Sequence, residues 1–310
     1  MDFDFSLYKQ IVQKTEKELK EYLYEYIKNK YAKIDNNELF LYAKGNIPIL
    51  LIAHLDTVFS KPPSQVFYNK EAKIIFSTEG GIGDDRAGVY AILKIISDNY
   101  KPHILFTCGE EIGGQGARAF VKKYSSPMKN LKYIIELDRQ GEKDCVFYDC
   151  DNKDFTKYIE DFDFLTNWGT FTDISIICPK WKIAGVNLSI GYFNEHTTQE
   201  ILLLDFLDNT ITKVKNLLED NCNISRFDYI ETEMLLCDCC AHYTPFLEPV
   251  YYKGTKVNLC WDCLKIARWC PRCGKAFFPE QLDDILCGEC KNDYLEQNRI
   301  NSTGKTCLGL

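Results

Sequence analysis

Histidine and acidic side chains recur where the apolar segments of the first two thirds of the chain end. Histidine nitrogens and carboxylate oxygens, without thiolates, suit hard or borderline divalent metal ions; zinc is favoured, and manganese or cobalt is possible. Such an ion can activate water for hydrolysis. The sequence therefore predicts a metal centre whose candidate residues are His54, Asp56, Asp84, Asp85, Glu110, Glu111, Asp138 and His196.

Each of these motifs, taken alone, also has a structural explanation. His54 and Asp56 lie two positions apart in an extended segment, so both side chains share a face and the carboxylate can fix the tautomer of a metal-binding imidazole. A purely structural histidine would show the same pattern. The Asp84–Asp85 pair could be an ordinary helix N-cap. The Glu110–Glu111 pair points in two directions, so one carboxylate could bind a metal ion while the other acts on water.

Apolar runs typical of β-strands alternate with stretches of helical periodicity. Strands are predicted at residues 39–44, 47–55, 73–78, 103–108 and 132–138. Helices are predicted at residues 5–30, 85–97, 114–124 and 198–218, with His196 at the start of the last one. This alternation predicts a doubly wound α/β fold with a largely parallel sheet covered on both faces. Ligands of such folds bind beyond the carboxyl ends of the strands, where three of the candidate motifs lie.

The motifs occur in an order that resembles a known clan of enzymes. The order is H-x-D (54–56), G-x-G-D-D-R-x-G (81–88), E-E-x-G-x-x-G-A (110–117), L-D (137–138) and N-x-H-x-x-x-E (194–200). It looks like the co-catalytic two-zinc exopeptidases, which include zinc aminopeptidases, deblocking aminopeptidases, peptidase T and carboxypeptidase G. The resemblance covers residues 45–203 and implies metal-dependent hydrolysis of peptide bonds.

The resemblance implies which residues bind the two catalytic zinc ions. His54 and Asp138 would bind one ion, and Glu111 and His196 would bind the other. Asp84 would bridge both ions. The proposed ligands thus come from five separate motifs of the sequence.

The resemblance also implies how the remaining residues of the site act. Asp56 would support the first histidine, and Glu110 would be the general base for the attacking water. A cis peptide bond between Asp84 and Asp85 would aim the bridging carboxylate. Glu200 would lie behind the last histidine.

The substrate is less closely defined than the metal ligands. Many relatives carry an inserted lid or dimerisation domain, whereas the gaps at residues 55–83 and 139–195 leave no room for one. An aminopeptidase is favoured; a carboxypeptidase, a dipeptidase or an amidohydrolase for N-acyl amino acids is the enzymatic alternative. Arg86 and Arg139 could hold a substrate carboxylate, but we expect them to form salt bridges with neighbouring acidic side chains.

The end of the chain is rich in cysteine. Ten of the fifteen cysteines lie in residues 226–310, which we predict to be a second domain after a catalytic domain at residues 1–225. Two sets of four show the paired Cys-x-x-Cys spacing of structural zinc sites. The sets are Cys237, Cys240, Cys260 and Cys263, and Cys270, Cys273, Cys287 and Cys290. An interleaved pairing is the alternative, and a protein partner could bind through these zinc ribbons.

Composition and charge limit the remaining functions. With 45% hydrophobic and 26% charged residues, the chain is typical of a folded globular protein. Its net charge of -8 argues against binding nucleic acid or an anionic membrane. The sequence has no long apolar run and no apolar signal core at its acidic N-terminus, so we expect a cytoplasmic protein. A non-catalytic scaffold that acts through the zinc ribbons is the remaining alternative, although no proposed ligand or base is missing.

Overall fold

The chain divides into two compact units, which are described separately. The computed structural model describes residues 3–233, 235–244, 247–252, 255–266, 268–272, 276–277 and 290–293. The division falls between Glu231 and Thr232.

Residues 226–231 belong to the first unit, although the sequence analysis assigned them to the cysteine-rich domain. The backbone N–H of Phe227 donates to the carbonyl of Lys132 (2.9 Å), and the Phe227 carbonyl accepts from the N–H of Ala184 (3.0 Å). These bonds attach the segment to the main sheet.

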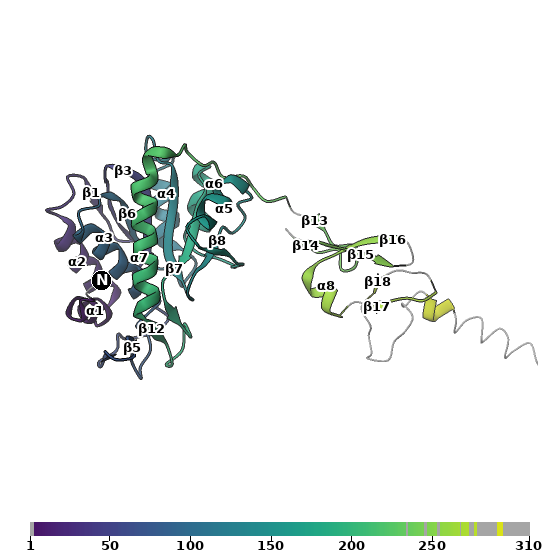
Figure 1. Cartoon of the computed structure of the whole chain (residues 1–310), viewed down its shortest axis with the longest axis horizontal. Coiled ribbons are helices and arrows are strands. Elements are labelled where there is room, and N and C mark those ends of the chain that lie inside the picture. Colours follow the sequence, from purple (N-terminus) through teal and green to yellow (C-terminus); the bar gives the residue numbers. More distant parts are fainter. Residues whose placement is uncertain are drawn as a thin grey trace, which may run out of the picture. The chain divides into compact units, whose positions relative to one another are not determined.

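The first unit is built on an eight-stranded sheet in the order β1-β2-β6-β3-β7-β10-β8-β9 (Figure 1). The four central strands β6, β3, β7 and β10 are parallel. β1 pairs antiparallel with β2, β2 with β6 and β8 with β10, while β9 pairs parallel with β8. The predicted α/β fold with a largely parallel sheet is therefore confirmed. The strands are β1 (Ile34–Asn36), β2 (Phe40–Ala43), β3 (Ile47–His54), β6 (Pro102–Thr107), β7 (Tyr133–Arg139), β8 (Asp144–Val146), β9 (Leu165–Thr166) and β10 (Gly185–Ser189).

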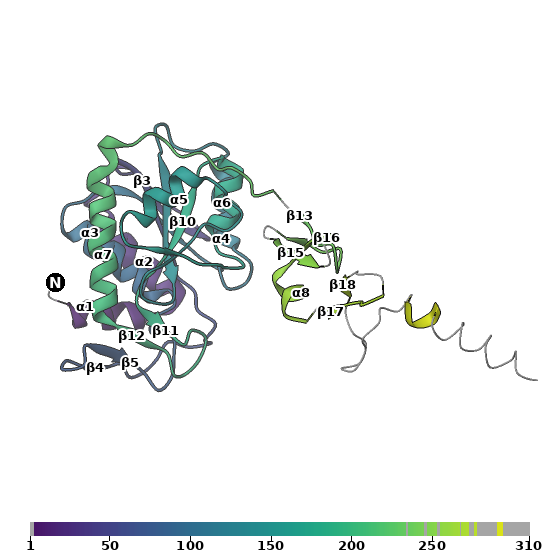
Figure 2. The ribbon, with the colours of Figure 1, turned by 45° about the vertical axis from the view of Figure 1, so that its right-hand side comes forward.

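Helices cover both faces of this sheet, as the doubly wound prediction requires. Figure 2 shows α3 and α7 on one side of the sheet and α4 and α6 on the other. The larger apolar core lies under α1, α2, α3, α5 and α7, and the smaller one lies under α4 and α6. The helices are α1 (Phe5–Val12), α2 (Glu16–Ile27), α3 (Arg86–Ser97), α4 (Gln115–Lys123), α5 (Lys153–Glu160), α6 (Ile174–Trp181), α7 (Leu204–Glu219) and the short 3-10 helix η1 (Asp220–Asn223).

A second, antiparallel sheet in the order β11-β12-β5-β4 lies in the same unit. Its strands are β4 (Phe67–Asn69), β5 (Ile74–Phe76), β11 (Tyr192–Phe193) and β12 (Ile201–Leu203). The strand predicted at residues 73–78 belongs to this sheet and not to the main one. Because residues 201–203 pair with β5, the helix predicted at residues 198–218 begins only at Leu204.

The helix predicted at residues 5–30 is in fact two helices. α2 has its own N-cap at Thr15, whose side chain accepts from the N–H of Glu18 while the Glu18 carboxylate accepts from the N–H of Thr15. This capping box starts a new helix and separates α2 from α1, because the capping residue itself is extended.

The described part of the second unit consists of short hairpins and one helix. The elements are β13 (Leu235–Leu236), β14 (Tyr243–Thr244), β15 (Glu248–Tyr252), β16 (Thr255–Leu259), α8 (Trp261–Ile266), β17 (Arg268–Trp269) and β18 (Ala276–Phe277). Its cluster of buried apolar residues consists of Leu259 and three cysteines, Cys237, Cys260 and Cys263, and Cys270 and Cys290 are also buried. A core of this size needs additional stabilisation, which a bound metal ion can supply.

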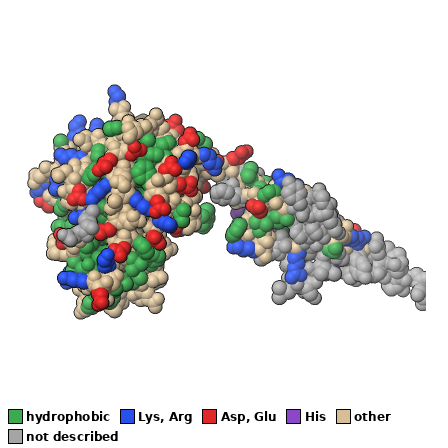
Figure 3. All heavy atoms as spheres, in the orientation of Figure 1, with side chains coloured by type: hydrophobic (Ala, Val, Ile, Leu, Met, Phe, Trp, Pro, Cys, Tyr) green, Lys and Arg blue, Asp and Glu red, His purple; other side chains and the backbone are tan. Residues whose placement is uncertain are grey.

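The surface of the first unit carries charges of both signs. On the face of the first unit in Figure 3, Lys and Arg side chains are interspersed with Asp and Glu, so this face offers no basic field for nucleic acid. Within the described residues, no helix has the length and apolar character needed to cross a membrane.

Candidate metal centre

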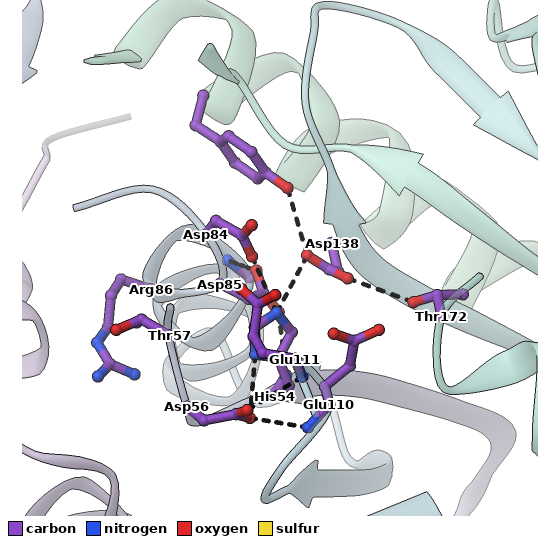
Figure 4. Close-up of polar contacts among 12 residues, drawn as sticks. His54, Asp56, Thr57, Asp84, Asp85, Arg86, Glu110, Glu111, Asp138 and Thr172 are labelled. Atoms are coloured by element: carbon purple, nitrogen blue, oxygen red, sulfur yellow. Dashed lines mark hydrogen bonds and ion pairs between the residues drawn. The ribbon is translucent and has the colours of Figure 1, made fainter. Parts of the chain in front are cut away.

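The candidate residues meet at the carboxyl ends of the central strands (Figure 4). His54 ends β3, the Glu110–Glu111 pair follows β6, and Asp138 lies near the end of β7. Asp84 lies just before α3. Residues that are up to 142 positions apart in the sequence, from His54 to His196, therefore reach one place.

His196 comes from a different element than the one predicted. It lies in the connection between β11 and β12 and has a positive φ of 63°. The prediction that it begins a helix was wrong, because residues 201–203 form β12 before the helix starts. Its side chain is 49% exposed, whereas that of His54 is 1% exposed. The site is therefore closed on the His54 side and open on the His196 side.

Asp84 lies between two sets of potential metal ligands. One of its oxygens, Oδ1, is 2.9 Å from Nε2 of His54, which is also 3.4 Å from Oδ1 of Asp138. The other oxygen, Oδ2, is 3.0 Å from Nε2 of His196, which is also 3.1 Å from Oε1 of Glu111. Each set offers one imidazole and two carboxylates, a donor set that suits zinc. Both sets share a single carboxylate, so two ions bound here would be neighbours.

Asp56 connects the first histidine to the turn that carries the two glutamates. Its Oδ1 lies 3.4 Å from Nδ1 of His54, on the ring side opposite the ligand atom. Its two oxygens accept from the N–H groups of Glu110 (3.0 Å) and Glu111 (3.1 Å). Burial disfavours the Asp56 carboxylate, but these contacts outweigh it and lower its pKa. Nδ1 of His54 has no hydrogen-bond partner in the described residues, so Asp56 is the nearby acceptor that a proton on this nitrogen would favour, and such a contact would fix the tautomer and orientation of the ring.

Asp84 and Asp85 make different contacts. The peptide bond between them is cis, as the resemblance implied. Asp85 lies close to His54 and Asp138, but its oxygens accept from the N–H groups of His54 (3.1 Å) and Gly88 (2.9 Å). It is the N-cap of α3, since its side chain satisfies a backbone amide of the first helical turn. The N-cap explanation thus holds for Asp85, and Asp84 is left to face the two histidines.

Glu200 holds the backbone that carries Asp84, a contact that the resemblance did not imply. Its carboxylate is 1% exposed and accepts from the N–H groups of Ile82 (2.7 Å) and Asp84 (2.9 Å). Burial raises its pKa, while hydrogen bonds from the amides of residues 82–84 act in the opposite direction. The last residue of the N-x-H-x-x-x-E motif therefore holds the backbone at Asp84.

Three residues that the sequence analysis did not single out surround Asp138. The hydroxyl groups of Tyr192 and Thr172 each donate to its carboxylate over 3.3 Å. The side chain of Asn187 accepts from the Asp138 N–H (2.9 Å) and donates to its carbonyl (3.1 Å). Thr172, Asn187 and Tyr192 lie outside the five motifs of the sequence analysis, so no motif marked them.

The pocket concentrates negative charge in a buried place. Burial raises the pKa of Glu110 to about 9, and nearby carboxylates, among them Asp138 and Asp173, add to this effect. Burial likewise raises the pKa of Asp138 to about 7. Buried oxygens of Glu136 and Asp173 have no hydrogen-bond partner. Divalent cations would compensate this unfavourable charge, so the electrostatics of the pocket fit the donor set.

The two arginines beside the site do not form the expected salt bridges. Arg86 is buried and donates to the carbonyls of Leu55 (2.5 Å) and Lys14 (3.2 Å). In the described residues, Arg139 forms no ion pair. The expectation for these two residues was therefore wrong.

The first set of cysteines comes together in the second unit. The sulfur atoms of Cys237, Cys240, Cys260 and Cys263 all lie within 4.8 Å of one another. The Cys237 sulfur also accepts from the N–H of Cys260 (3.2 Å), and although its burial acts the other way, backbone N–H groups lower its pKa to about 6. Four thiolates so close can hold one zinc ion tetrahedrally, and they follow the sequential pairing.

The second set of cysteines is described only in part. Cys270 and Cys290 are buried. Cys273 and Cys287 lie outside the described residues. The second four-cysteine site therefore stays a prediction.

Comparison with known proteins identifies the family of the first unit. Residues 8–162, half of the chain, match the sequence model of peptidase family M28. The chain belongs to peptidase family M28. This match includes every candidate metal ligand of the first unit except His196, which lies beyond residue 162.

Individual proteins resemble the chain over different lengths. Probable carboxypeptidases from Aspergillus flavus and Aspergillus oryzae are each 30% identical over 108 residues, which cover 31% of this chain and 25% of each relative. The matched region thus spans a quarter of the length of these relatives.

Solved structures show the same fold at low sequence identity. An aminopeptidase from Bacillus cereus has a TM-score of 0.59 at 14% identity and covers 70% of this chain and 97% of its own. A tripeptidase from Staphylococcus aureus has a TM-score of 0.58 at 14% identity, with 71% and 98% covered. An aminopeptidase from Desulfurococcus kamchatkensis has a TM-score of 0.54 at 16% identity, with 70% and 94% covered.

Proposed function

We propose that this chain is a metal-dependent exopeptidase, most simply an aminopeptidase, with two zinc ions in the pocket. His54 and Asp138 would hold one ion, His196 and Glu111 the other, and Asp84 both. The observation that carries the proposal is the position of the Asp84 carboxylate, whose two oxygens each face a different histidine at 2.9 and 3.0 Å. Membership of peptidase family M28 supports peptide hydrolysis as the reaction.

We propose Glu110 as the general base. Its carboxylate is 9% exposed and projects into the pocket beside Asp138 and Glu111 (Figure 4). Its side chain forms no hydrogen bond to the described residues, so it is free to face a water molecule or substrate. When bound, divalent ions would polarise the scissile carbonyl and lower the pKa of a nearby water. Glu110 would take a proton from that water on a carboxylate oxygen and pass it to the leaving amine nitrogen.

The direction of exopeptidase action is proposed from the relatives. The solved structures with the same fold include proteins named as aminopeptidases and a tripeptidase. The curated relatives are named as probable carboxypeptidases, and this favours carboxypeptidase or dipeptidase action as the second candidate. An N-acyl amino acid amidohydrolase is a further alternative within the same chemistry.

The second unit would contribute structure and binding. We propose that Cys237, Cys240, Cys260 and Cys263 hold a structural zinc ion, since an all-thiolate site leaves no open position for a substrate. The second predicted set would hold another. The exposed side chain of Trp261, 69% accessible, could then take part in binding a protein partner.

Replacement of the general base tests the proposed reaction. Glu110→Gln should retain its metal ions and lower turnover about 10²- to 10⁴-fold, the usual contribution of a general base. Metal content and initial rates are measured on a panel of aminoacyl, dipeptide, C-terminal and N-acyl substrates. Glu21→Gln, at an exposed position on α2, is the matched control and should keep the wild-type rate. A Glu110→Gln protein that is fully loaded with metal and as fast as the wild type would contradict the role of this residue.

A further inference from the structure

Arg139 directly follows the candidate ligand Asp138 at the end of β7. β7 pairs with β10, and in this pairing Glu136 lies opposite Asn187 while Arg139 lies opposite Ser189. Two residues of β7 therefore oppose one residue of β10, which is the arrangement of a β-bulge.

The bulge determines the face on which Arg139 lies. Side chains of directly paired residues share a face of the sheet, and alternate residues of a strand point the same way. Asn187 and Ser189 share one face, so their partners Glu136 and Arg139 share it too. This is the face on which Asn187 reaches Asp138 and the hydroxyl of Tyr148 (3.2 Å). The bulge thus brings the guanidinium to the side of the sheet where the metal centre is built.

Within the described residues, the guanidinium of Arg139 has no hydrogen-bond or ion-pair partner. Its Nε is buried without a hydrogen bond, and in the described part of the chain we find no ion pair or hydrogen bond to the rest of the group. Buried polar groups are nearly always satisfied, and an unpaired buried cation is costly. Arg86, whose Nε also lacks a partner in the described residues, at least donates through its two terminal nitrogens to the carbonyls of Leu55 and Lys14. An unused, partly buried guanidinium beside an active site is therefore available to an anionic group of a ligand.

Tyr148 is a second polar group at this edge of the site. Burial raises its pKa, and the positive charge of Arg139 acts in the opposite direction. Its hydroxyl lies on Asn187, the residue of β10 that shares a face of the sheet with Ser189, the partner of Arg139. The phenol oxygen accepts from Asn187, so its own proton is free to be donated. A Cβ atom added to Gly169 would be 3.1 Å from the Tyr148 ring, and the same segment leads to Thr172, which contacts Asp138. Tyr148 therefore borders the metal centre, and Arg139 directly follows the candidate ligand Asp138.

We propose that Arg139 binds the free C-terminal carboxylate of a short peptide substrate, with the Tyr148 hydroxyl as an additional donor. The planar guanidinium donates two parallel hydrogen bonds to a carboxylate, a geometry that no backbone carbonyl of a longer peptide can match. This inference rests on the proposed peptidase function and adds the substrate class: di- and tripeptides whose carboxylate lies close to the scissile bond. Longer or C-terminally blocked peptides would be poor substrates.

The wild-type enzyme alone gives the first test. A tripeptide with a free carboxylate and the same tripeptide as its C-terminal amide are compared by kcat and KM. A charged hydrogen-bonded pair predicts a preference of about 10- to 100-fold in kcat/KM for the free acid, expressed mainly in KM. Equal kcat/KM values for acid and amide would overturn the inference while leaving the peptidase function intact. Hydrolysis of neither substrate would instead count against the proposed function itself.

Variants assign the preference to Arg139. In Arg139→Met the ratio of kcat/KM for the acid to that for the amide should fall toward 1. Arg139→Lys keeps the charge but not the planar guanidinium, so its ratio should lie between those of the wild type and Arg139→Met. Arg226→Met is the matched control, because Arg226 is paired with Asp228 on the surface, and it should keep the wild-type ratio. Metal content and melting temperature are measured for each variant. A folded, metal-loaded Arg139→Met that keeps the full preference would remove Arg139 from the carboxylate site.

Discussion

Glu200 offers a sensitive perturbation of the metal centre, because it touches neither histidine and yet holds the segment that carries Asp84. Its buried carboxylate accepts from the N–H groups of Ile82 (2.7 Å) and Asp84 (2.9 Å). In Glu200→Gln the amide oxygen can keep one of these bonds, while the amide NH₂ group faces the other N–H donor. One charged hydrogen bond is lost and a buried backbone amide is left without an acceptor.

The size of this effect follows from the contacts. Loss of a hydrogen bond to a charged, buried acceptor costs about 2–3 kcal/mol of the free energy of unfolding. For a unit of this length, that lowers the melting temperature by about 4–12 °C. Displacement of a residue that orients a ligand should also weaken metal binding by about 10- to 100-fold.

Calorimetry and a metal-buffer titration measure the two effects in the same preparation. The control is Glu79→Gln, whose exposed carboxylate also accepts from backbone amides, those of Ser64 (3.1 Å) and Gln65 (3.2 Å). We expect it to change the melting temperature little and metal affinity not at all. If Glu200→Gln bound metal as tightly as the wild type, the argument that Glu200 positions Asp84 would be refuted.

Two further predictions concern pH and metal content. Burial raises the pKa of Asp138 from 3.8 to about 7 and that of Glu110 from 4.5 to about 9. The folded state therefore favours the protonated forms of both groups. The stability gained from protonation is present at low pH and is lost as the pH rises through the pKa values of the folded state. The melting temperature of the metal-free protein should therefore fall as the pH is raised from about 4.5 to 9, and added zinc should restore it. A metal-free melting temperature that rises over this range would contradict the raised pKa values of Asp138 and Glu110. Cys260→Ser should lower the zinc content by one equivalent per chain, whereas Cys222→Ser, at an exposed cysteine outside the cluster, should not. Plasma emission spectrometry gives both values, and an unchanged zinc content in Cys260→Ser would exclude the four-thiolate site.

The main sheet and the position of the site could be predicted from local patterns. β3, β6 and β7 are short apolar runs, each followed by polar residues that carry chemistry, and periodicity alone places their ends to within a residue or two. Because the central strands are parallel, these ends lie at one edge of the sheet. This is why residues from distant motifs could be expected to meet.

Contacts made over long distances in the sequence could not be predicted in this way. Residues 201–203 look helical because they are apolar and continue into α7, but pairing with β5 makes them a strand and places His196 in a connection. Glu200 follows the last histidine by about one helical turn in the sequence, yet its hydrogen-bond partners lie 116 and 118 residues away. Tertiary pairing overrides local propensity at both positions.

The missing salt bridges have a similar cause. Arg86 lies beside Asp85 in the sequence, but Asp85 is occupied as the cap of α3, and the guanidinium turns to backbone carbonyls. Arg139 is displaced by a bulge in β7 that no sequence pattern indicates. Sequence adjacency to an acidic residue therefore predicted the wrong partner in both cases.

The most direct measurement of the central claim is anomalous diffraction from crystals grown with zinc, recorded on both sides of the zinc absorption edge. The account predicts two zinc peaks in the first unit, one held by His54 and Asp138 and one by His196 and Glu111, with an oxygen of Asp84 on each. Anomalous maps without peaks at this position, or with zinc bound while Asp84 points away from it, would contradict the account.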